Sequence, residues 1–279
     1  MGIEVPRSPD KAVEGGKLGH VMRKGQSLGC VECAVPGETL ADKLGILESR
    51  GMWLELVNDG KKQLKDVLDS LEGFDTSIES VQAYMLHKLQ MLGAGEAEQK
   101  AAVRHVEDTI KMASEVSAKN VVVTVTYGVP KVKKPREKCI KLFKHFGRLG
   151  RELDVLVSIE PLGRDKTTFL PSVPEVHSLV RDVGSSHVRL MADTMHIHNN
   201  EGDVAGVVRK YFAEISELQL RDTNSRPPGQ GSVNFTPLLK IIRKKFRGLI
   251  CLEYKPSSNP SSDFDQACKF VADFISAVR

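Results

Sequence analysis

Four polar residues lie at the ends of four successive apolar runs in the second half of the chain. They are Glu160 in VSIEP, Asp193 in MADTMH, Gln219 in ELQLRD and Glu253 in ICLEY. A carboxylate at the end of a buried strand is costly unless it is paired or binds a metal ion. Three carboxylates and one amide oxygen form a hard, oxygen-rich donor set, which suits Mg²⁺ or Mn²⁺ better than a structural zinc ion. The pattern predicts a divalent-metal site if the fold brings the four run ends together.

Short β-branched apolar runs alternate with longer amphipathic segments along most of the chain. The predicted strands cover residues 28–35, 52–58, 76–84, 120–128, 155–161, 187–196, 215–222 and 248–254. The predicted helices include 38–51, 61–73, 96–118, 136–153, 173–184, 203–214, 234–246 and 263–278. The helices show apolar residues at i, i+3, i+4 and i+7, and the strands are apolar on both faces, as buried parallel strands are.

Repeated β–α units of this number and total length predict an α/β protein with a (β/α)8 TIM barrel over residues 28–279. An open doubly wound sheet usually has a glycine-rich phosphate loop after its first strand, and the chain contains no G-x-G-x-x-G. Residues 1–27 fall outside the repeat and are expected to form an N-terminal arm. The Pro/Gly-rich segment 222–235 is expected to be a shaped loop after strand seven. In a barrel the active site lies at the carboxyl ends of the strands, so the four polar residues should converge.

Other candidates on the early strands are weaker. Glu32 and Glu55 are as consistent with ion-pair partners as with site residues. Cys30 and Cys33 form a C-x-x-C, but no second pair at zinc spacing accompanies it. On one strand these two positions point to opposite faces, so we interpret both as buried small apolar residues.

The composition excludes several classes of protein. The 279 residues carry a formal net charge of +4, with 41% hydrophobic and 27% charged residues, which is typical of a globular protein. No apolar run approaches the ~18 residues of a membrane span, and the first residues have no apolar signal region. The basic run 131–138 is interpreted as a solvated loop. We therefore expect a cytoplasmic protein that acts on neither membranes nor nucleic acid.

Three motifs resemble a known family. IEPL (159–162), the D-x-x-H of Asp193 and His196, and LEY on strand eight are similar to the xylose-isomerase-like TIM barrels of sugar isomerases and epimerases. Within that group the chain is most similar to the hydroxypyruvate isomerases. Gln219 lies where the ketose 3-epimerases have His, EGDV (201–204) follows the D-x-x-H segment at the matching distance, and EYKP (253–256) closes strand eight.

The resemblance implies roles for six residues. Glu160, Asp193, Gln219 and Glu253 would be metal ligands, and Glu160 and Glu253 would also be the acid–base pair. His196 and Arg226 would contact substrate oxygens. The ion would be Mn²⁺ or Mg²⁺, with Co²⁺ and Zn²⁺ as alternatives. The reaction would interconvert a hydroxy-aldehyde or aldose with a ketose or hydroxy-ketone through an enediolate, and the partner would be a small hydroxy-carbonyl or sugar substrate.

Three other functions stay open. A ketose 3-epimerase would use the same site, and a non-catalytic sugar-binding barrel would keep the ligand set. An endonuclease-IV-like nuclease resembles the chain over Glu160, Asp193 and His196. That nuclease needs several more histidines at strand ends, and here strand seven offers Gln219. Assembly into a homo-oligomer is also left open.

Overall fold

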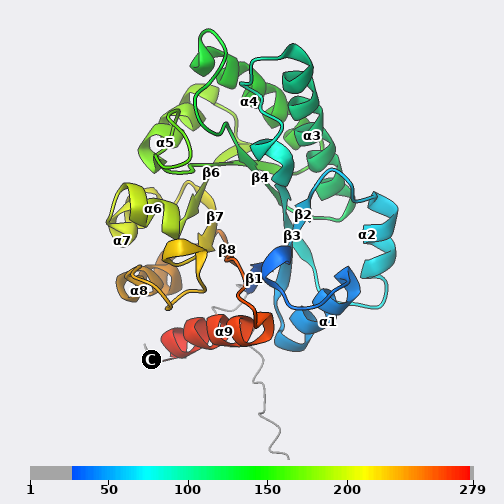
Figure 1. Ribbon diagram of the computed structural model, residues 1–279, viewed down its shortest axis with the longest axis vertical. Helices are drawn as coiled ribbons and strands as arrows, with labels where there is room; N and C mark the ends of the chain where they lie inside the picture. Colours follow the sequence, from blue (N-terminus) through cyan, green and yellow to red (C-terminus); the bar gives the residue numbers. More distant parts are fainter. Residues whose placement is uncertain (1–26, 277–279) are drawn as a thin grey trace, which may run out of the picture.

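The computed structural model of the chain describes residues 27–276 (Figure 1). Eight parallel strands close into a barrel in the order β1 to β8, each hydrogen-bonded to its sequence neighbours and β1 to β8. The strands are β1 (Leu28–Val31), β2 (Trp53–Asn58), β3 (Ile78–Ala83), β4 (Asn120–Thr124), β5 (Leu156–Glu160), β6 (Val188–Asp193), β7 (Ile215–Leu220) and β8 (Leu249–Leu252). The predicted (β/α)8 fold is confirmed.

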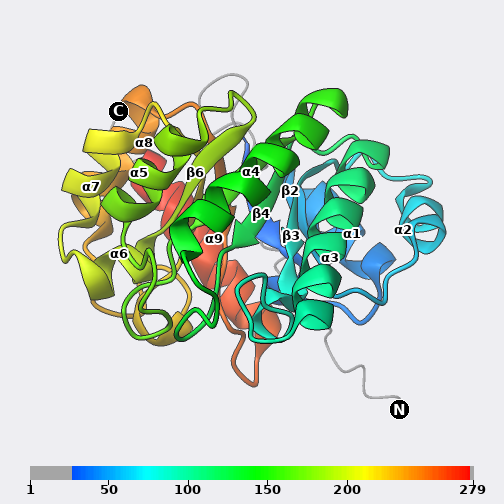
Figure 2. The ribbon, with the colours of Figure 1, turned by 90° about the horizontal axis from the view of Figure 1, so that it is seen from above.

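The α-helices form an outer ring around this barrel, which Figure 2 shows from the side. They are α1 (Leu40–Arg50), α2 (Leu64–Leu71), α3 (Glu96–Glu115), α4 (Pro135–Glu152), α5 (Val173–Val183), α6 (Thr194–Asn200), α7 (Val204–Tyr211), α8 (Phe235–Lys245) and α9 (Pro260–Ser276). Short 3₁₀ turns cover Glu32–Ala34, Tyr84–His87 and Thr223–Ser225. The predicted arm over residues 1–27 lies outside the described residues, apart from Ser27.

Local signals in the sequence account for several helix boundaries. Thr39 and Ser172 each form a reciprocal capping box with the residue three positions later, so α1 and α5 begin with satisfied N–H groups. Both helices end at a glycine in the left-handed region, Gly51 with φ 63° and Gly184 with φ 65°, which an L side chain adopts only with strain.

Several strands are shorter than their apolar runs, and for β6 and β1 the structure shows the reason. We expected a strand over 187–196, but β6 ends at Asp193 because the Asp193 carboxylate accepts the His196 N–H at 2.9 Å and begins α6. The first run leaves the sheet at Val31 and continues as a 3₁₀ turn. Cys30 is buried in β1 as expected, but the prediction for Cys33 was wrong: the turn exposes it.

Apolar side chains fill the space between the barrel and the helices, including Phe143 and Phe146 of α4, which are fully buried. The inside of the barrel is more polar. Asn120 on β4 donates to Glu217 on β7 at 2.8 Å and to Ser80 on β3 at 3.3 Å. Since β4 and β7 are not neighbours in the sheet, the contact between Asn120 and Glu217 crosses the barrel interior.

The loop after β7 is built around one buried carboxylate. Asp222 accepts the backbone N–H groups of Thr223, Gly229 and Val233 at 2.8 to 3.0 Å and is 0% exposed. These bonds give the Pro/Gly-rich segment a defined shape, as expected for 222–235. No helix among residues 27–276 combines the length and the apolar character needed to cross a membrane.

Candidate active site

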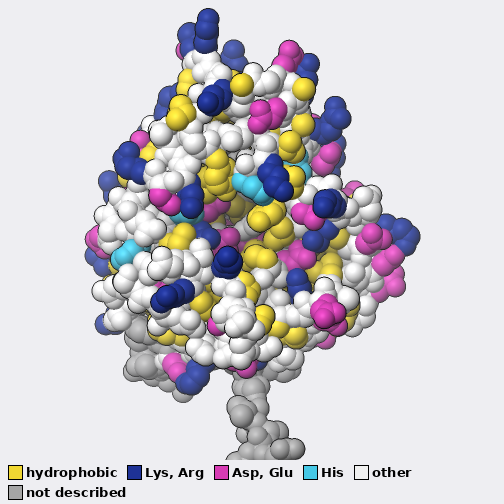
Figure 3. All heavy atoms as spheres, viewed as in Figure 1, with side chains coloured by type: hydrophobic (Ala, Val, Ile, Leu, Met, Phe, Trp, Pro, Cys, Tyr) yellow, Lys and Arg dark blue, Asp and Glu magenta, His cyan; other side chains and the backbone are white. Residues whose placement is uncertain are grey.

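A cavity of about 230 Å³ lies at the carboxyl ends of the strands. Figure 3 keeps the view of Figure 1 and shows Asp and Glu side chains inside a hollow near the middle of this face. The polar side chains that line the cavity come from the ends of β3 to β8 and the segments that follow them. They include Gln82, Thr124, Tyr127, Glu160, Lys166, His196, Arg221 and Glu253.

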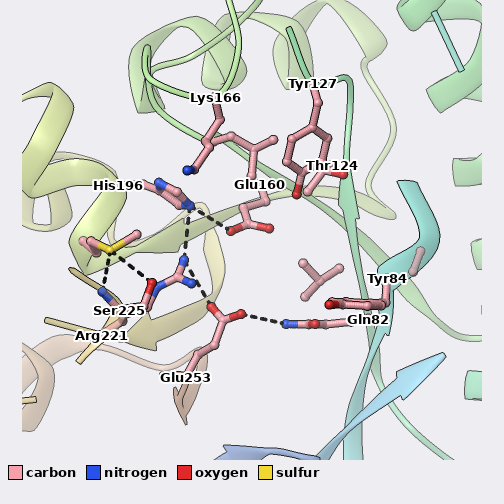
Figure 4. A pocket seen from close by; sticks show the side chains of 14 residues that line it. Gln82, Tyr84, Thr124, Tyr127, Glu160, Lys166, His196, Arg221, Ser225 and Glu253 are labelled. Atoms are coloured by element: carbon pink, nitrogen blue, oxygen red, sulfur yellow. Dashed lines mark hydrogen bonds and ion pairs between the residues drawn. The ribbon is translucent and has the colours of Figure 1, made fainter. Parts of the chain in front are cut away.

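Glu160 and Glu253 point into this cavity from opposite sides (Figure 4). Glu160 is the last residue of β5 and Glu253 directly follows β8. Burial, together with the charges of Glu253 and Asp193, raises the pKa of Glu160 well above its usual range. Burial also raises the pKa of Glu253, although the adjacent Arg221 opposes this shift. Two carboxyl groups that readily hold a proton therefore face one small space.

Arg221 lies among the acidic groups of the site. Its Nε and Nη2 atoms are each 3.0 Å from Asp193 Oδ2, and Nη2 is 3.4 Å from Glu253 Oε2. The guanidinium also donates to His196 Nε2 at 3.1 Å. Because Arg221 is two positions after Gln219 and four after Glu217, a strand period of two places all three on the inward face. Arg221 thus joins the ends of β6, β7 and β8 at the cavity wall.

His196 stands between this arginine and Glu160, whose Oε1 is 3.8 Å from His196 Nε2. Burial and the Arg221 charge lower the pKa of His196 to about 3, so the ring is neutral near pH 7. An arginine can only donate, so Nε2 accepts and the ring proton is on Nδ1. His196 is held in one tautomer by its neighbours.

Gln219 lies deeper in the barrel than Arg221. Its Nε2 donates to both carboxylate oxygens of Glu55 on β2, each at 3.0 Å, across the barrel interior. Its Oε1 is buried and has no hydrogen-bond partner. The amide is therefore oriented by Glu55, with its oxygen free to accept.

Below Gln219 is a fully buried acidic cluster. Ligand atoms of Glu55, Glu217 and Cys251 lie within 4.8 Å of one another, the one such group of His, Cys, Asp and Glu among the described residues. Burial and the Glu217 charge raise the pKa of Glu55 well above its usual range, and burial raises that of Glu217. Two buried carboxyl groups this close together favour the protonated form, because ionising both would place like charges side by side without water.

The four residues predicted to bind a metal ion have only part of the arrangement that we expected. Glu160, Asp193 and Glu253 all lie at the strand ends as predicted, and Gln219 is in register with Asp193 on the neighbouring strand. Glu160 and Glu253 line the cavity, whereas Asp193 and Gln219 are not among its lining residues. Gln219 Oε1 is a buried acceptor without a hydrogen-bond donor, which a hard cation would satisfy, whereas Glu253 Oε2 already has an ion pair with Arg221 at 3.4 Å. The donor types suit a divalent ion, but within residues 27–276 the carboxylates of Glu160, Asp193 and Glu253 do not form a group within 4.8 Å of one another, and Arg221 contacts Asp193 and Glu253.

Other predicted residues have different places. Arg226 is on the exposed loop after β7, where its Nη1 donates to the backbone oxygen of Gln230 at 3.3 Å, and the arginine that lines the cavity is Arg221. Glu32 forms an ion pair with Lys62 at 3.0 Å, which is one of the two roles expected for it. Glu55 instead accepts hydrogen bonds from the side-chain amide of Gln219. Three polar residues that line the cavity were not predicted from the sequence: Arg221, Gln82 and Lys166. The period of two from Gln219 was the signal for Arg221.

Fold and site together define a (β/α)8 barrel with an acid-rich pocket at the carboxyl end. The family model of the xylose isomerase-like TIM barrels matches residues 47–274 of the chain. The chain therefore belongs to this family.

Two relatives share parts of the sequence. The chain is 28% identical over 119 residues to a D-psicose 3-epimerase of Enterocloster bolteae, covering 42% of the chain and 40% of the relative. It is 30% identical over 109 residues to a hydroxypyruvate isomerase of Escherichia coli, covering 38% of the chain and 42% of the relative. The matched part thus spans under half of each relative's length.

Solved structures share the fold at lower identity. The 3-keto-D-glucoside 4-epimerase YcjR from E. coli superposes with a TM-score of 0.79 at 15% identity, covering 89% of this chain and 99% of that one. The IolI protein, solved with a bound zinc atom, gives a TM-score of 0.73 at 14% identity, covering 90% and 99%. A member of this fold thus holds a divalent metal ion.

Proposed function

We propose that the protein is an isomerase that moves a proton between adjacent carbons of a small hydroxy-carbonyl compound, in the manner of the hydroxypyruvate isomerases. The observation that carries this proposal is the pair Glu160 and Glu253, which face each other across one cavity with raised pKa values. Proton transfer by a placed carboxylate contributes typically about 10²–10⁴-fold to a rate.

The proton transfers follow from this arrangement. One glutamate, as the carboxylate, removes the C–H proton of the hydroxyl-bearing carbon. The C–H electron pair forms the C=C bond of an enediolate, and the carbonyl π pair moves to oxygen. A carboxyl group then protonates the former carbonyl carbon with the C=C electron pair. The proton of the former hydroxyl oxygen passes to the former carbonyl oxygen, so the first oxygen becomes the new carbonyl and the second the new hydroxyl. The Arg221 guanidinium lines the cavity, where it can donate to a substrate oxygen, and His196 Nε2 can accept from a substrate hydroxyl.

A metal ion would add to this chemistry. Glu160, Asp193, Gln219 and Glu253 would hold it, with Mn²⁺ or Mg²⁺ preferred for their oxygen donors. When bound, a divalent ion supplies Lewis-acid stabilisation of negative charge on substrate oxygens.

The size of the cavity favours a short substrate. Its volume of about 230 Å³ is below the ~300–1,000 Å³ typical of pockets for drug-sized ligands. A small hydroxy-carbonyl compound is therefore preferred to a drug-sized ligand. The alternative, a ketose 3-epimerase, would use the same two glutamates on opposite faces of one carbon.

The deciding experiment is an NMR screen in D₂O over short hydroxy-aldehydes, hydroxy-ketones and ketohexoses, with Mn²⁺, Mg²⁺ or Co²⁺ supplied. An isomerase converts an aldehyde into a ketone, whereas an epimerase inverts one carbon and leaves the carbonyl in place. Enzyme-dependent deuterium incorporation at carbon that is absent in Glu160→Gln and Glu253→Gln supports the proposal. No incorporation into any substrate, with the protein folded, would favour the sugar-binding barrel.

We also propose a reducing, cytoplasmic setting. All five cysteines are free thiols in the structure, and four of them are buried. Free thiols without disulfides are typical of proteins kept in a reducing compartment.

A further inference from the structure

The candidate metal ligands already have a cation beside them. Arg221 Nη2 lies 3.0 Å from Asp193 Oδ2 and 3.4 Å from Glu253 Oε2, and its side chain is only 13% exposed. Its guanidinium therefore bridges two of the four predicted ligands from within the protein.

A divalent ion and this guanidinium could not both occupy the same place. Mg²⁺ binds carboxylate oxygens at about 2.0–2.1 Å, so an ion shared by Asp193 and Glu253 would lie close to the present position of Nη2. Two like charges about 4 Å apart in a partly buried site repel each other by several kcal/mol. Binding of the ion would require Arg221 to release both carboxylates.

Arg221 has space to move. It lines the cavity, which also contains the neutral ring of His196 and the exposed ends of Tyr127 and Lys166 (Figure 4). A long side chain anchored one residue after β7 can turn from the carboxylates into this space without a change in the barrel.

We propose that Arg221 is a built-in counter-ion that competes with a divalent metal ion for Asp193 and Glu253. Without metal it neutralises the two buried carboxylates and holds them in place. When metal binds, the guanidinium moves into the cavity and becomes available to a substrate oxygen or carboxylate. This inference rests on the metal site of the proposed function, but its test contains no substrate.

The test is a Mn²⁺ titration of the full chain, with free Mn²⁺ measured by EPR. Arg221→Met removes the charge but keeps an unbranched side chain, and it should raise Mn²⁺ affinity by at least about tenfold. Arg221→Lys keeps the positive charge but loses the contact of both Nε and Nη2 with Asp193. Its Mn²⁺ affinity should lie between those of the parent and Arg221→Met. Lys166→Met is the matched control, because Lys166 lines the same cavity but forms its ion pair with Asp165. It should change the affinity by less than about threefold.

A second readout is thermal unfolding of the same samples. Metal-free Arg221→Met should unfold at a lower temperature than the parent, because two buried carboxylates lose their partner, and Mn²⁺ should restore it. Binding by Arg221→Met but not by the parent would also support competition. Equal affinity in parent, Arg221→Met and Lys166→Met, or no binding in any of them, would overturn the inference. Turnover of substrate is measured in a separate experiment. Failure of the Arg221 proposal can therefore be distinguished from failure of the isomerase proposal.

Discussion

The side-chain amide of Gln219 donates to both carboxylate oxygens of Glu55, each at 3.0 Å, although the residues are 164 positions apart in the chain. This contact fixes the direction of the one neutral ligand in the predicted metal set. Glu55 in turn belongs to the buried cluster with Glu217 and Cys251. The orientation of Gln219 is therefore set by a residue of that cluster.

The first prediction concerns the acid–base pair. Glu160→Gln and Glu253→Gln keep an oxygen that can bind metal but cannot take a proton, so turnover should fall by about 10²-fold or more while metal remains bound. Asp193→Asn, which we assign to coordination alone, should regain substantial activity at high Mn²⁺. Turnover and metal content are to be measured on the same samples. Full activity of a metal-loaded Glu160→Gln or Glu253→Gln enzyme would remove that residue from the mechanism.

The second prediction concerns Gln219. Gln219→Leu removes both the amide oxygen and the donor to Glu55, so we expect loss of metal affinity, loss of most activity and a stability cost of about 1–3 kcal/mol. Gln219→His keeps a ligand atom and should retain metal binding with an altered metal preference. Calorimetric titration and denaturant unfolding measure the two effects. If Gln219→Leu binds metal as the parent does, Gln219 is not a ligand.

The third prediction is a pH dependence of stability from Glu55 and Glu217. Both pKa values are raised on folding, so the stability of this pair is complete below the ordinary glutamate pKa of about 4.3 and is lost as the pH rises through the raised values. Glu217→Gln keeps an acceptor for Asn120 but cannot ionise. Its unfolding free energy should therefore fall less than that of the parent between pH 5 and pH 9.

Denaturant unfolding at several pH values tests this, with Glu72→Gln, a change at an exposed glutamate, as the control. The control should follow the parent curve. Parallel curves for the parent and Glu217→Gln would show that the buried pair does not titrate in this range.

The fourth prediction concerns the packing of β1 on β2. A Cβ at Gly29 would lie 2.2 Å from Trp53 Cε2, far inside contact distance, so Gly29→Ala must displace the buried indole ring. We expect a loss of at least about 1–3 kcal/mol of stability. Gly45→Ala is the control: it lies in α1, its Cβ would meet Phe74 at 3.4 Å, and helix propensity favours alanine by about 1 kcal/mol. A stable Gly29→Ala protein would show that β1 can shift on its neighbour.

The sequence by itself determined the barrel fold and the end of the barrel at which the candidate ligands lie. Alternating apolar runs and amphipathic segments are local patterns, and eight such units close in only a few ways. Because all strands are parallel, the residues that end the runs, Glu160, Asp193 and Glu253, must lie on one face. The boundaries were less certain: Asp193 ended β6 early because its carboxylate caps the next helix.

Only the tertiary structure decided which side chains meet across the barrel. Gln219 reaches Glu55 on a non-adjacent strand, and Arg221 rather than Arg226 lies between Asp193 and Glu253. Both arginines are near the end of the same strand, and the period of two from Gln219 favours Arg221 only if the strand direction continues past Leu220. The difference arises because Asp222 folds the loop around its buried carboxylate, which leaves Arg226 outside, while Arg221 keeps the inward direction of the strand. Contacts of this kind depend on the closure of the sheet, which brings together residues that the chain keeps far apart.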